Sequence, residues 1–200
     1  MPYQFDPQSH RYRDAETGRF VKYAQVLEVV DQEVNRLEVR LKGHARLLTQ
    51  GKIHIAEFQT RMAQNLKESH LRNASIGAGG IKQLTPTDYG KVGAELKKQY
   101  KFLNGFGQDL AEGKLTKEGA IRRAGSYAKS AKTSFFEAEF TSRGKVGFYA
   151  KRLLDAQSRH CQSCISYQRL QWTLIQLVTP PGIDCECGGR CRCRLVFRKL

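Results

Sequence analysis

The sequence predicts a mainly α protein, an elongated helical bundle of αα-hairpins with an extended N-terminal arm and a small C-terminal module. Apolar residues recur every three or four positions through most of the chain, which is the spacing of one helix face. Gly51 and Gly113 interrupt that spacing where antiparallel helices could be joined. All six cysteines lie between Cys161 and Cys193. The expected divisions are an arm at 1–21, a helical body at 22–155 and a cysteine-rich module at 156–200.

The N-terminal arm is expected to contain a short hairpin. Tyr12 and Phe20 stand on either side of a turn-rich stretch in which Gly18 can adopt a positive φ. An isolated hairpin is marginally stable in water, so the arm should dock on another surface. The side chains expected to contact neighbouring proteins are Tyr3, Phe5, Tyr12, Arg13, Arg19 and Phe20.

Two apolar stripes predict the first two helices, one beginning after Lys22 and one after the turn at Gly51. Their members are Val26, Val30, Val34, Leu37 and Leu41, then Ile55, Phe58, Met62 and Leu66. The second stripe runs into residues 74–80, whose glycines predict a flexible joint. No Gly-Lys-Ser or Gly-Lys-Thr follows these glycines, which argues against a phosphate-binding loop.

The next two helices are each expected to begin at a threonine. Residues 85–88, Thr-Pro-Thr-Asp, combine a capping hydroxyl, a proline for the first helical position and an early carboxylate. Thr116 opens the fourth helix. The apolar positions are Tyr89, Val92, Leu96, Tyr100 and Leu103, then Ile121, Ala124, Ala128, Ala131 and Phe135. Tyr149, Leu153 and Leu154 predict a further short helix before the cysteines.

The net charge of +15 predicts attraction to polyanions such as nucleic acid, an acidic protein surface or anionic lipid. Most of the basic residues are expected on solvated helix faces. The exception is a C-terminal cluster of Arg190, Arg192, Arg194, Arg198 and Lys199. No apolar run approaches the roughly 20 residues that span a bilayer, so no membrane partner is expected.

The cysteine spacing predicts a structural zinc site. A Cys-x-x-Cys turn can present two thiolates to one ion, and a second pair completes a tetrahedron. The expected ligands are Cys161, Cys164, Cys187 and Cys191, with Cys185 and Cys193 as alternates. Gly188 and Gly189 allow a tight turn between ligands. The Pro-Pro-Gly run at 180–182 is expected to stiffen and reverse the chain before it reaches the second group of cysteines. Disulfides are the alternative, but such scaffolds usually distribute cysteines along the whole fold.

No catalytic site is predicted. His160 lies beside Cys161, but adjacent residues rarely point at each other and no orienting group is evident. The remaining histidines, His10, His44, His54 and His70, lack metal-ligand spacing. We expect His44 and His70 to be partly exposed on helix surfaces. The acidic residues form no pair suited to general acid and base roles.

Three phrases of the sequence form a recognisable combination. The first is residues 11–21, with Arg-Tyr-Arg-Asp and Thr-Gly-Arg-Phe-Val. The second is the helical middle, in which Gly-Lys-Ile at 51–53 is echoed by Gly-Lys-Leu at 113–115. The third is the end, where Cys161-x-x-Cys164 is followed by Cys-Arg-Cys-Arg-Leu at 191–195. Together these phrases resemble the minor head, or head-morphogenesis, proteins of tailed bacteriophages.

One departure from that family concerns the metal ligands. Its members often carry a histidine shortly before the final Cys-Arg-Cys, where this sequence has Cys185 and Cys187. The resemblance matches Cys161, Cys164 and Cys191 to ligand positions. The fourth ligand is then either Cys185 or Cys187.

The resemblance implies a low-copy structural component of the virion, at the head or portal vertex, that occupies the host cytoplasm before assembly. It would serve head assembly or DNA delivery, oligomerise in the particle, contact portal, capsid or neck proteins, and touch packaged DNA non-specifically. The charge keeps a second class open, a basic nucleic-acid-binding zinc protein that acts as a packaging or regulatory factor.

Overall fold

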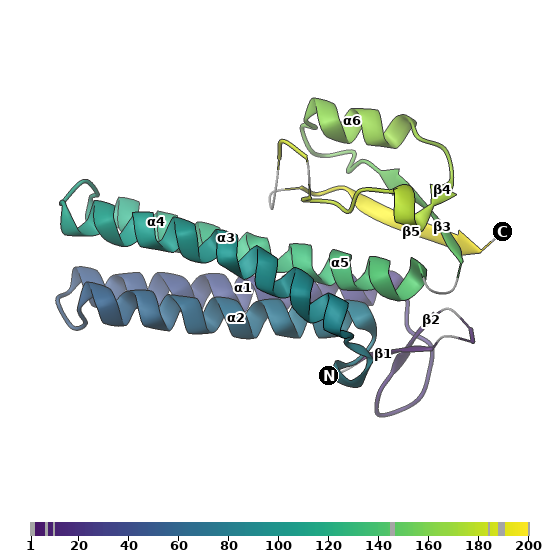
Figure 1. The fold of residues 1–200 in the computed structure, drawn as a ribbon, viewed down its shortest axis with the longest axis horizontal. Helices are drawn as coiled ribbons and strands as arrows, with labels where there is room; N and C mark the ends of the chain where they lie inside the picture. Colours follow the sequence, from purple (N-terminus) through teal and green to yellow (C-terminus); the bar gives the residue numbers. More distant parts are fainter. Residues whose placement is uncertain are drawn as a thin grey trace.

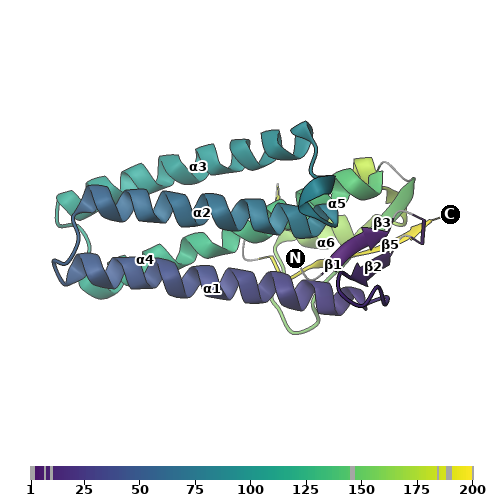
Figure 2. The ribbon, with the colours of Figure 1, turned by 90° about the horizontal axis from the view of Figure 1, so that it is seen from below.

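The computed structural model describes residues 3–6, 8–9, 11–144, 147–183, 185–187 and 191–199. As predicted, the fold is mainly α. Long helices run alternately up and down as an elongated bundle (Figure 1). They are α1 (Tyr23–Thr49), α2 (Ile55–Ala78), α3 (Pro86–Ala111) and a last arm formed by α4 (Lys117–Ser126), the 3-10 turn η2 (Tyr127–Ser130) and α5 (Ala131–Gly144). Seen from below, α1 lies beside α2 and α4, and α3 flanks α2 (Figure 2).

The predicted turns and helix starts are confirmed. Gly51 and Gly113 take positive φ values of 70° and 66° at the ends of α1 and α3, a conformation that glycine adopts without steric cost. The Thr85 hydroxyl accepts from the Asp88 amide, and the Asp88 carboxylate accepts from the Thr85 amide at 2.8 Å. Thr116 accepts from the Gly119 amide at 3.0 Å. Local sequence therefore determines where the helices begin and reverse.

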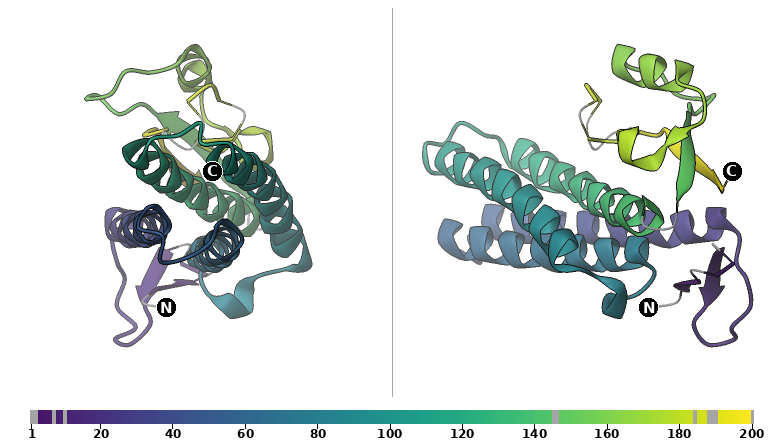
Figure 3. Two further views of the ribbon diagram at one scale, coloured as in Figure 1. Left: turned by 90° about the vertical axis from the view of Figure 1, so that its left-hand side faces the viewer. Right: turned by 45° about the vertical axis from the view of Figure 1, so that its right-hand side comes forward.

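Most residues of the predicted stripes meet in the core of the bundle, whose helices Figure 3 shows end-on. Leu41, Phe58, Met62 and Leu66 are fully buried. Phe106 joins them, with its ring edge-on to Phe58 at a centroid distance of 5.4 Å. Tyr89 is 49% exposed and contributes little to this core.

Residues 74–80 are a packed helix end, so the predicted flexible joint is wrong. α2 continues to Ala78, and Gly77 is buried against α5. A Cβ on Gly77 would lie 2.1 Å from the backbone oxygen of Phe135. Gly79 takes a φ of 84° at the helix C-cap, and a Cβ there would lie 2.1 Å from the Cβ of Phe5. These glycines permit close backbone approach.

The N-terminal hairpin docks on the bundle of its own chain. β1 (Tyr3–Asp6) pairs antiparallel with β2 (Arg11–Asp14), and the turn at Gly18 returns the chain so that Phe20 bridges Arg13. The Phe5 amide donates to the Gly79 carbonyl at 3.1 Å, and the Tyr12 hydroxyl donates to the Gly77 carbonyl at 3.1 Å.

Burial corrects part of the expectation for the arm. Phe5 and Tyr12 are 7% and 3% exposed. Contrary to the prediction, these two side chains are therefore not available to neighbouring proteins. Phe20 remains 40% exposed, with the guanidinium groups of Arg11 and Arg13 at 4.4 and 3.9 Å from its ring centroid. His10 lies outside the described residues.

The C-terminal module is a small sheet covered by one helix. β3 (Phe148–Leu153) is central, between β4 (Thr173–Leu174) and β5 (Arg194–Lys199), and α6 (Gln162–Arg169) packs against it. The helix predicted at 149–154 is therefore wrong. Buried and half-buried residues alternate along β3, which is the period of a strand. Because β3 pairs with β5, this sheet spans the predicted division at residue 155. The short 3-10 turns are η1 (Ile81–Gln83) and η3 (Ile175–Leu177).

A buried ion pair joins the hairpin, the bundle and the sheet. Glu139 and Arg143 of α5 are 0% and 5% exposed and lie 3.1 Å apart. The Tyr23 hydroxyl donates to Glu139 Oε2 at 2.7 Å. Burial raises the pKa of Glu139, and Arg143 opposes that rise. Five aromatic rings lie within 5.9 Å of the guanidinium carbon: those of Phe5, Tyr12, Tyr23, Phe148 and Phe197.

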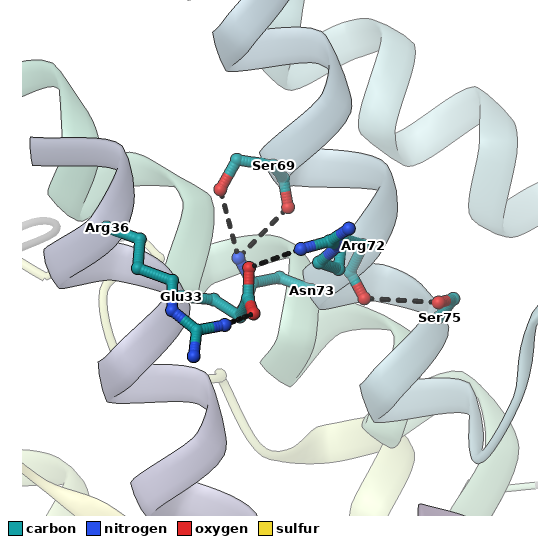
Figure 4. A network of polar contacts seen from close by, with 6 residues as sticks. All are labelled: Glu33, Arg36, Ser69, Arg72, Asn73 and Ser75. Atoms are coloured by element: carbon teal, nitrogen blue, oxygen red, sulfur yellow. Dashed lines mark hydrogen bonds and ion pairs between the residues drawn. The ribbon is translucent and has the colours of Figure 1, made fainter. Parts of the chain in front are cut away.

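A second polar network links α1 and α2 near the surface (Figure 4). Glu33 accepts from Arg36 at 2.8 Å and from Arg72 at 2.9 Å, and Asn73 donates to the Ser69 carbonyl at 2.9 Å. Both arginines are more than half exposed, so these pairs contribute little to stability. Among the helices that the structure describes, none is both long and apolar enough to cross a membrane.

His70 is fully buried, and the expectation that it is partly exposed is wrong. Its Nδ1 lies 2.8 Å from the Ser134 hydroxyl and its Nε2 lies 3.1 Å from the Ser130 hydroxyl. Burial lowers the pKa of His70 to about 4, with Glu95 opposing the shift. The imidazole is therefore neutral in the folded protein at pH 7.

Gly77→Ala should lower the free energy of unfolding by at least about 2 kcal/mol, because the new methyl group would overlap the Phe135 carbonyl. Gly43→Ala is the matched control, since nothing lies within 4 Å of a Cβ at that helical position. It should raise the free energy of unfolding by about 0.5–1 kcal/mol. Urea unfolding measures both. Equal effects of the two substitutions would contradict the close packing of α2 on α5.

Buried His70 should make the protein less stable in mild acid. Its pKa is about 4 when folded and about 6.5 when unfolded. Only the unfolded chain gains the proton between those values, so stability is retained above pH 6.5 and falls towards pH 4, by about 3 kcal/mol. His70→Gln should flatten this dependence in urea unfolding. His54→Gln, at an exposed position, should leave it unchanged; identical profiles for both variants would refute the assignment.

Candidate metal centre

The C-terminal module brings cysteines from three chain segments together. Cys161 is the N-cap of α6 and Cys164 lies in its first turn. The next pair follows the turn at 180–183, where the Ile183 amide donates to the Pro180 carbonyl at 3.2 Å. The last pair leads into β5. The buried cysteines are Cys164, Cys185, Cys191 and Cys193, and the half-buried ones are Cys161 and Cys187.

Four of these cysteines are close enough to hold one metal ion. The Sγ atoms of Cys164, Cys185, Cys187 and Cys191 all lie within 4.8 Å of one another. Cys164 is 3.5 Å from Cys187 and 3.6 Å from Cys191. A tetrahedral site with metal–sulfur bonds of about 2.3 Å has edges of about 3.8 Å, so this spacing fits a metal centre. All six cysteines are free thiols.

This group differs by one residue from the predicted ligand set. Cys164, Cys187 and Cys191 belong to both, and the structure adds Cys185, an expected alternate. Cys161 lies 3.5 Å from Cys187, and Cys193 is 4% exposed. The choice of four ligands stays a prediction, because all six thiols gather in one place. Gly188, Gly189 and Arg190 lie outside the described residues.

Arg152 is the residue of the site that the sequence analysis missed. It projects from the buried side of β3, is 1% exposed, and places its Nη1 3.6 Å from the Cys164 sulfur. Its Nη2 donates to the Thr179 carbonyl, and its guanidinium carbon lies 4.6 Å from the Tyr167 ring centroid. No carboxylate of the described residues forms an ion pair with it. A buried guanidinium favours negative charge nearby, which thiolates provide.

The thiols differ in how readily they ionise. Burial opposes ionisation of Cys161, but the backbone amides of Cys164 and Cys187 lower its pKa to about 7. Burial raises the pKa of Cys164 and Cys187 above the usual range, and that of Cys193 to about 11. Without a cation Cys164, Cys187 and Cys193 therefore stay neutral at pH 7. Burial opposes ionisation of Cys191 too, but the backbone amide of Cys193 and the neighbouring thiols together outweigh it, so the pKa of Cys191 is lowered. A bound metal ion would favour their thiolate forms.

Two other arrangements of reactive side chains lack the geometry of a catalytic site. His160 points its Nε2 at the Asp155 carbonyl, 2.7 Å away. His70 and Ser134 form a short hydrogen bond, but both are fully buried in the bundle. A substrate could not reach that pair without unfolding the surrounding helices.

The fold and the site define a helical-bundle protein whose C-terminal module carries a cysteine cluster able to hold a metal ion. No protein-family model, curated protein or solved structure matches the chain.

Removing bound metal from the purified chain should loosen the C-terminal module before the bundle. Structural zinc contributes ~10 kcal/mol to folding in small metal-binding peptides, so a chelator should lower the melting temperature and expose the amides of β3 and β5 to hydrogen exchange. The amides of α1 and α2 should remain protected, and added metal should restore the module. Cys164→Ser should respond weakly to chelator. Unchanged exchange of the β3 and β5 amides in the wild-type chain would contradict a structural metal.

Proposed function

We propose that this protein is a non-catalytic structural component of a tailed-phage particle, a minor head or portal-vertex protein acting in head assembly or DNA delivery. The observation that carries the proposal is the cysteine cluster, in which four of the six thiols are buried, because such a thiolate set around a metal ion would stabilise a chain segment. The phage-like phrases at 11–21, 51–53 and 191–195 support the particular class. The proposed neighbours are portal, capsid or neck proteins, the proposed location is the virion, and the state in the particle is oligomeric.

We propose zinc as the metal. An all-cysteine donor set of tetrahedral spacing is typical of structural zinc sites. Such sites leave no open coordination position for a substrate or water. Zinc also performs no redox chemistry under physiological conditions, which suits a component that must persist in an assembled particle.

The exposed edge of the hairpin is the proposed contact with neighbouring particle proteins. Arg19 and Phe20 are exposed, and the arginines that flank the Phe20 ring form a basic and aromatic surface. Arginine and aromatic side chains are enriched at interfaces. Because Phe5 and Tyr12 are part of the core, deletion of the whole arm would also damage the bundle. Point substitutions at the exposed edge therefore test the contact better.

A second candidate is a nucleic-acid-binding zinc protein. The observation that favours it is the alternation along 191–195, where Cys191 and Cys193 face inward and Arg192 and Arg194 are exposed. Arg198 adds a guanidinium 4.2 Å above the Trp172 ring. A metal-supported row of arginines can bind a phosphate backbone without reading bases. This candidate requires affinity that falls steeply with salt.

Quantitative mass spectrometry of purified, nuclease-treated particles tests the proposed function. The chain should be present at a fixed ratio to the portal protein. Phe20→Ser should reduce incorporation at least several-fold without changing the melting temperature. Val39→Ser, at a position 67% exposed on α1, should incorporate normally.

Absence from particles, with abundant protein in infected cells, would overturn the particle role. DNA binding would then be measured at increasing salt, with charge reversal at Arg192 and Arg194. A steep salt dependence that the reversal abolishes would establish the second candidate.

A further inference from the structure

We propose that the six cysteines form one cluster holding two divalent metal ions, which share the thiolates of Cys164 and Cys187. The inference deepens the metal site of the proposed function and rests on that site being metal-bound. It differs from a four-cysteine, one-ion centre in giving every cysteine a ligand role.

The surroundings of Cys164 exceed what one tetrahedron supplies. In a single tetrahedral site each sulfur faces only the other three ligand sulfurs. The Cys164 sulfur lies 3.5 Å from that of Cys187 and 3.6 Å from that of Cys191. The Cys185 sulfur lies within 4.8 Å of it as well, and Cys161 and Cys193 pack in the same cluster. Sulfurs therefore surround Cys164 on more sides than one ion requires.

The sulfur of Cys187, which lies on another chain segment, is likewise surrounded by several cysteine sulfurs. Its sulfur is 3.5 Å from those of Cys161 and Cys185, as well as from Cys164. The Cys191 sulfur lies within 4.8 Å of it too. When two tetrahedra share an edge, the two shared corners face each other and all the remaining corners. Cys164 and Cys187 lie nearest to that position, because each has more sulfur neighbours within 3.6 Å than any other cysteine of the cluster.

The remaining cysteines divide into two terminal pairs. Cys161 and Cys185 both contact Cys187 at 3.5 Å and would complete one tetrahedron. Cys191 lies 3.6 Å from Cys164, and Cys193 packs in the same cluster. Cys191 and Cys193 would complete the second tetrahedron. Each ion then has two terminal thiolates and the two shared ones.

Burial and charge are compatible with the second ion. Cys185 and Cys193 are 8% and 4% exposed. A single ion would leave at least one buried thiol uncoordinated beside the thiolate ligands. Six thiolates with two dipositive ions carry a net charge of −2, the same as four thiolates with one ion. The second ion, together with two further thiolates, therefore leaves the net charge of the site unchanged. The guanidinium of Arg152, adjacent to the shared Cys164, partly offsets that charge in either case.

The test is the metal content of the full chain. Protein loaded with zinc and freed of excess should contain two zinc ions per chain by native mass spectrometry, with an independent elemental analysis as a check. Cadmium-113 substitution should give two resonances from sulfur-only sites, coupled to each other through shared sulfurs. One zinc per chain, or a single cadmium resonance, would overturn the inference and leave the one-ion centre intact. Absence of tightly bound zinc would overturn both.

Two variants distinguish shared from unused thiols. Under the proposal Cys161→Ser and Cys193→Ser each remove a terminal ligand, so zinc content should fall from two towards one per chain. A single ion held by Cys164, Cys185, Cys187 and Cys191 would be unaffected by either change. Unaltered zinc content in both variants would therefore refute the two-ion cluster even if one variant folds poorly. The presence or absence of the chain in particles does not bear on this outcome.

Discussion

The buried pair of Glu139 and Arg143 is the interaction on which the arrangement of this protein most depends. A charge pair removed from water costs more than it returns unless its remaining hydrogen-bonding groups are satisfied. Here tyrosine hydroxyls serve the carboxylate, and aromatic faces surround the guanidinium. Those rings come from the hairpin, α1 and the C-terminal sheet, with Tyr12, Phe148 and Phe197 among them. One pair on α5 therefore couples three parts of the chain.

A second buried arginine gives the cysteine cluster its electrostatic setting. Arg152 stands at the far end of the same β3 strand whose Phe148 contacts Arg143. The strand thus contributes Phe148 to the surroundings of the ion pair and Arg152 to the cysteine cluster. The pairing of β3 with β5 holds both ends in register. Disorder in the cluster would loosen a strand that also supports the ion pair. Strand β3 therefore connects the candidate metal centre to the bundle.

Local signals predicted much of this fold, and non-local contacts explain the errors. The stripes, the turn at Gly51 and the helix start at Thr85 depend on neighbouring residues only, and these predictions are confirmed. The glycines near Gly77 looked flexible, because sequence does not distinguish freedom from close packing. His70 and Arg152 could not be recognised as buried, since their burial depends on partners far along the chain. Cysteine spacing located the candidate metal centre, but six clustered thiols left its ligand set open.

The order of strands in the C-terminal sheet has a consequence for folding during synthesis. β3 emerges before any cysteine, whereas its partner β5 follows the last one. The first three helices can pack as they leave the ribosome, because each contacts the next along the chain, whereas α4 and α5 pack on α1 and α2. The sheet cannot close until every thiol has been made. Metal capture and sheet closure are therefore late and simultaneous events, and a nascent chain stalled before β5 would display unpaired strand edges and unprotected thiols to the cell's quality-control machinery.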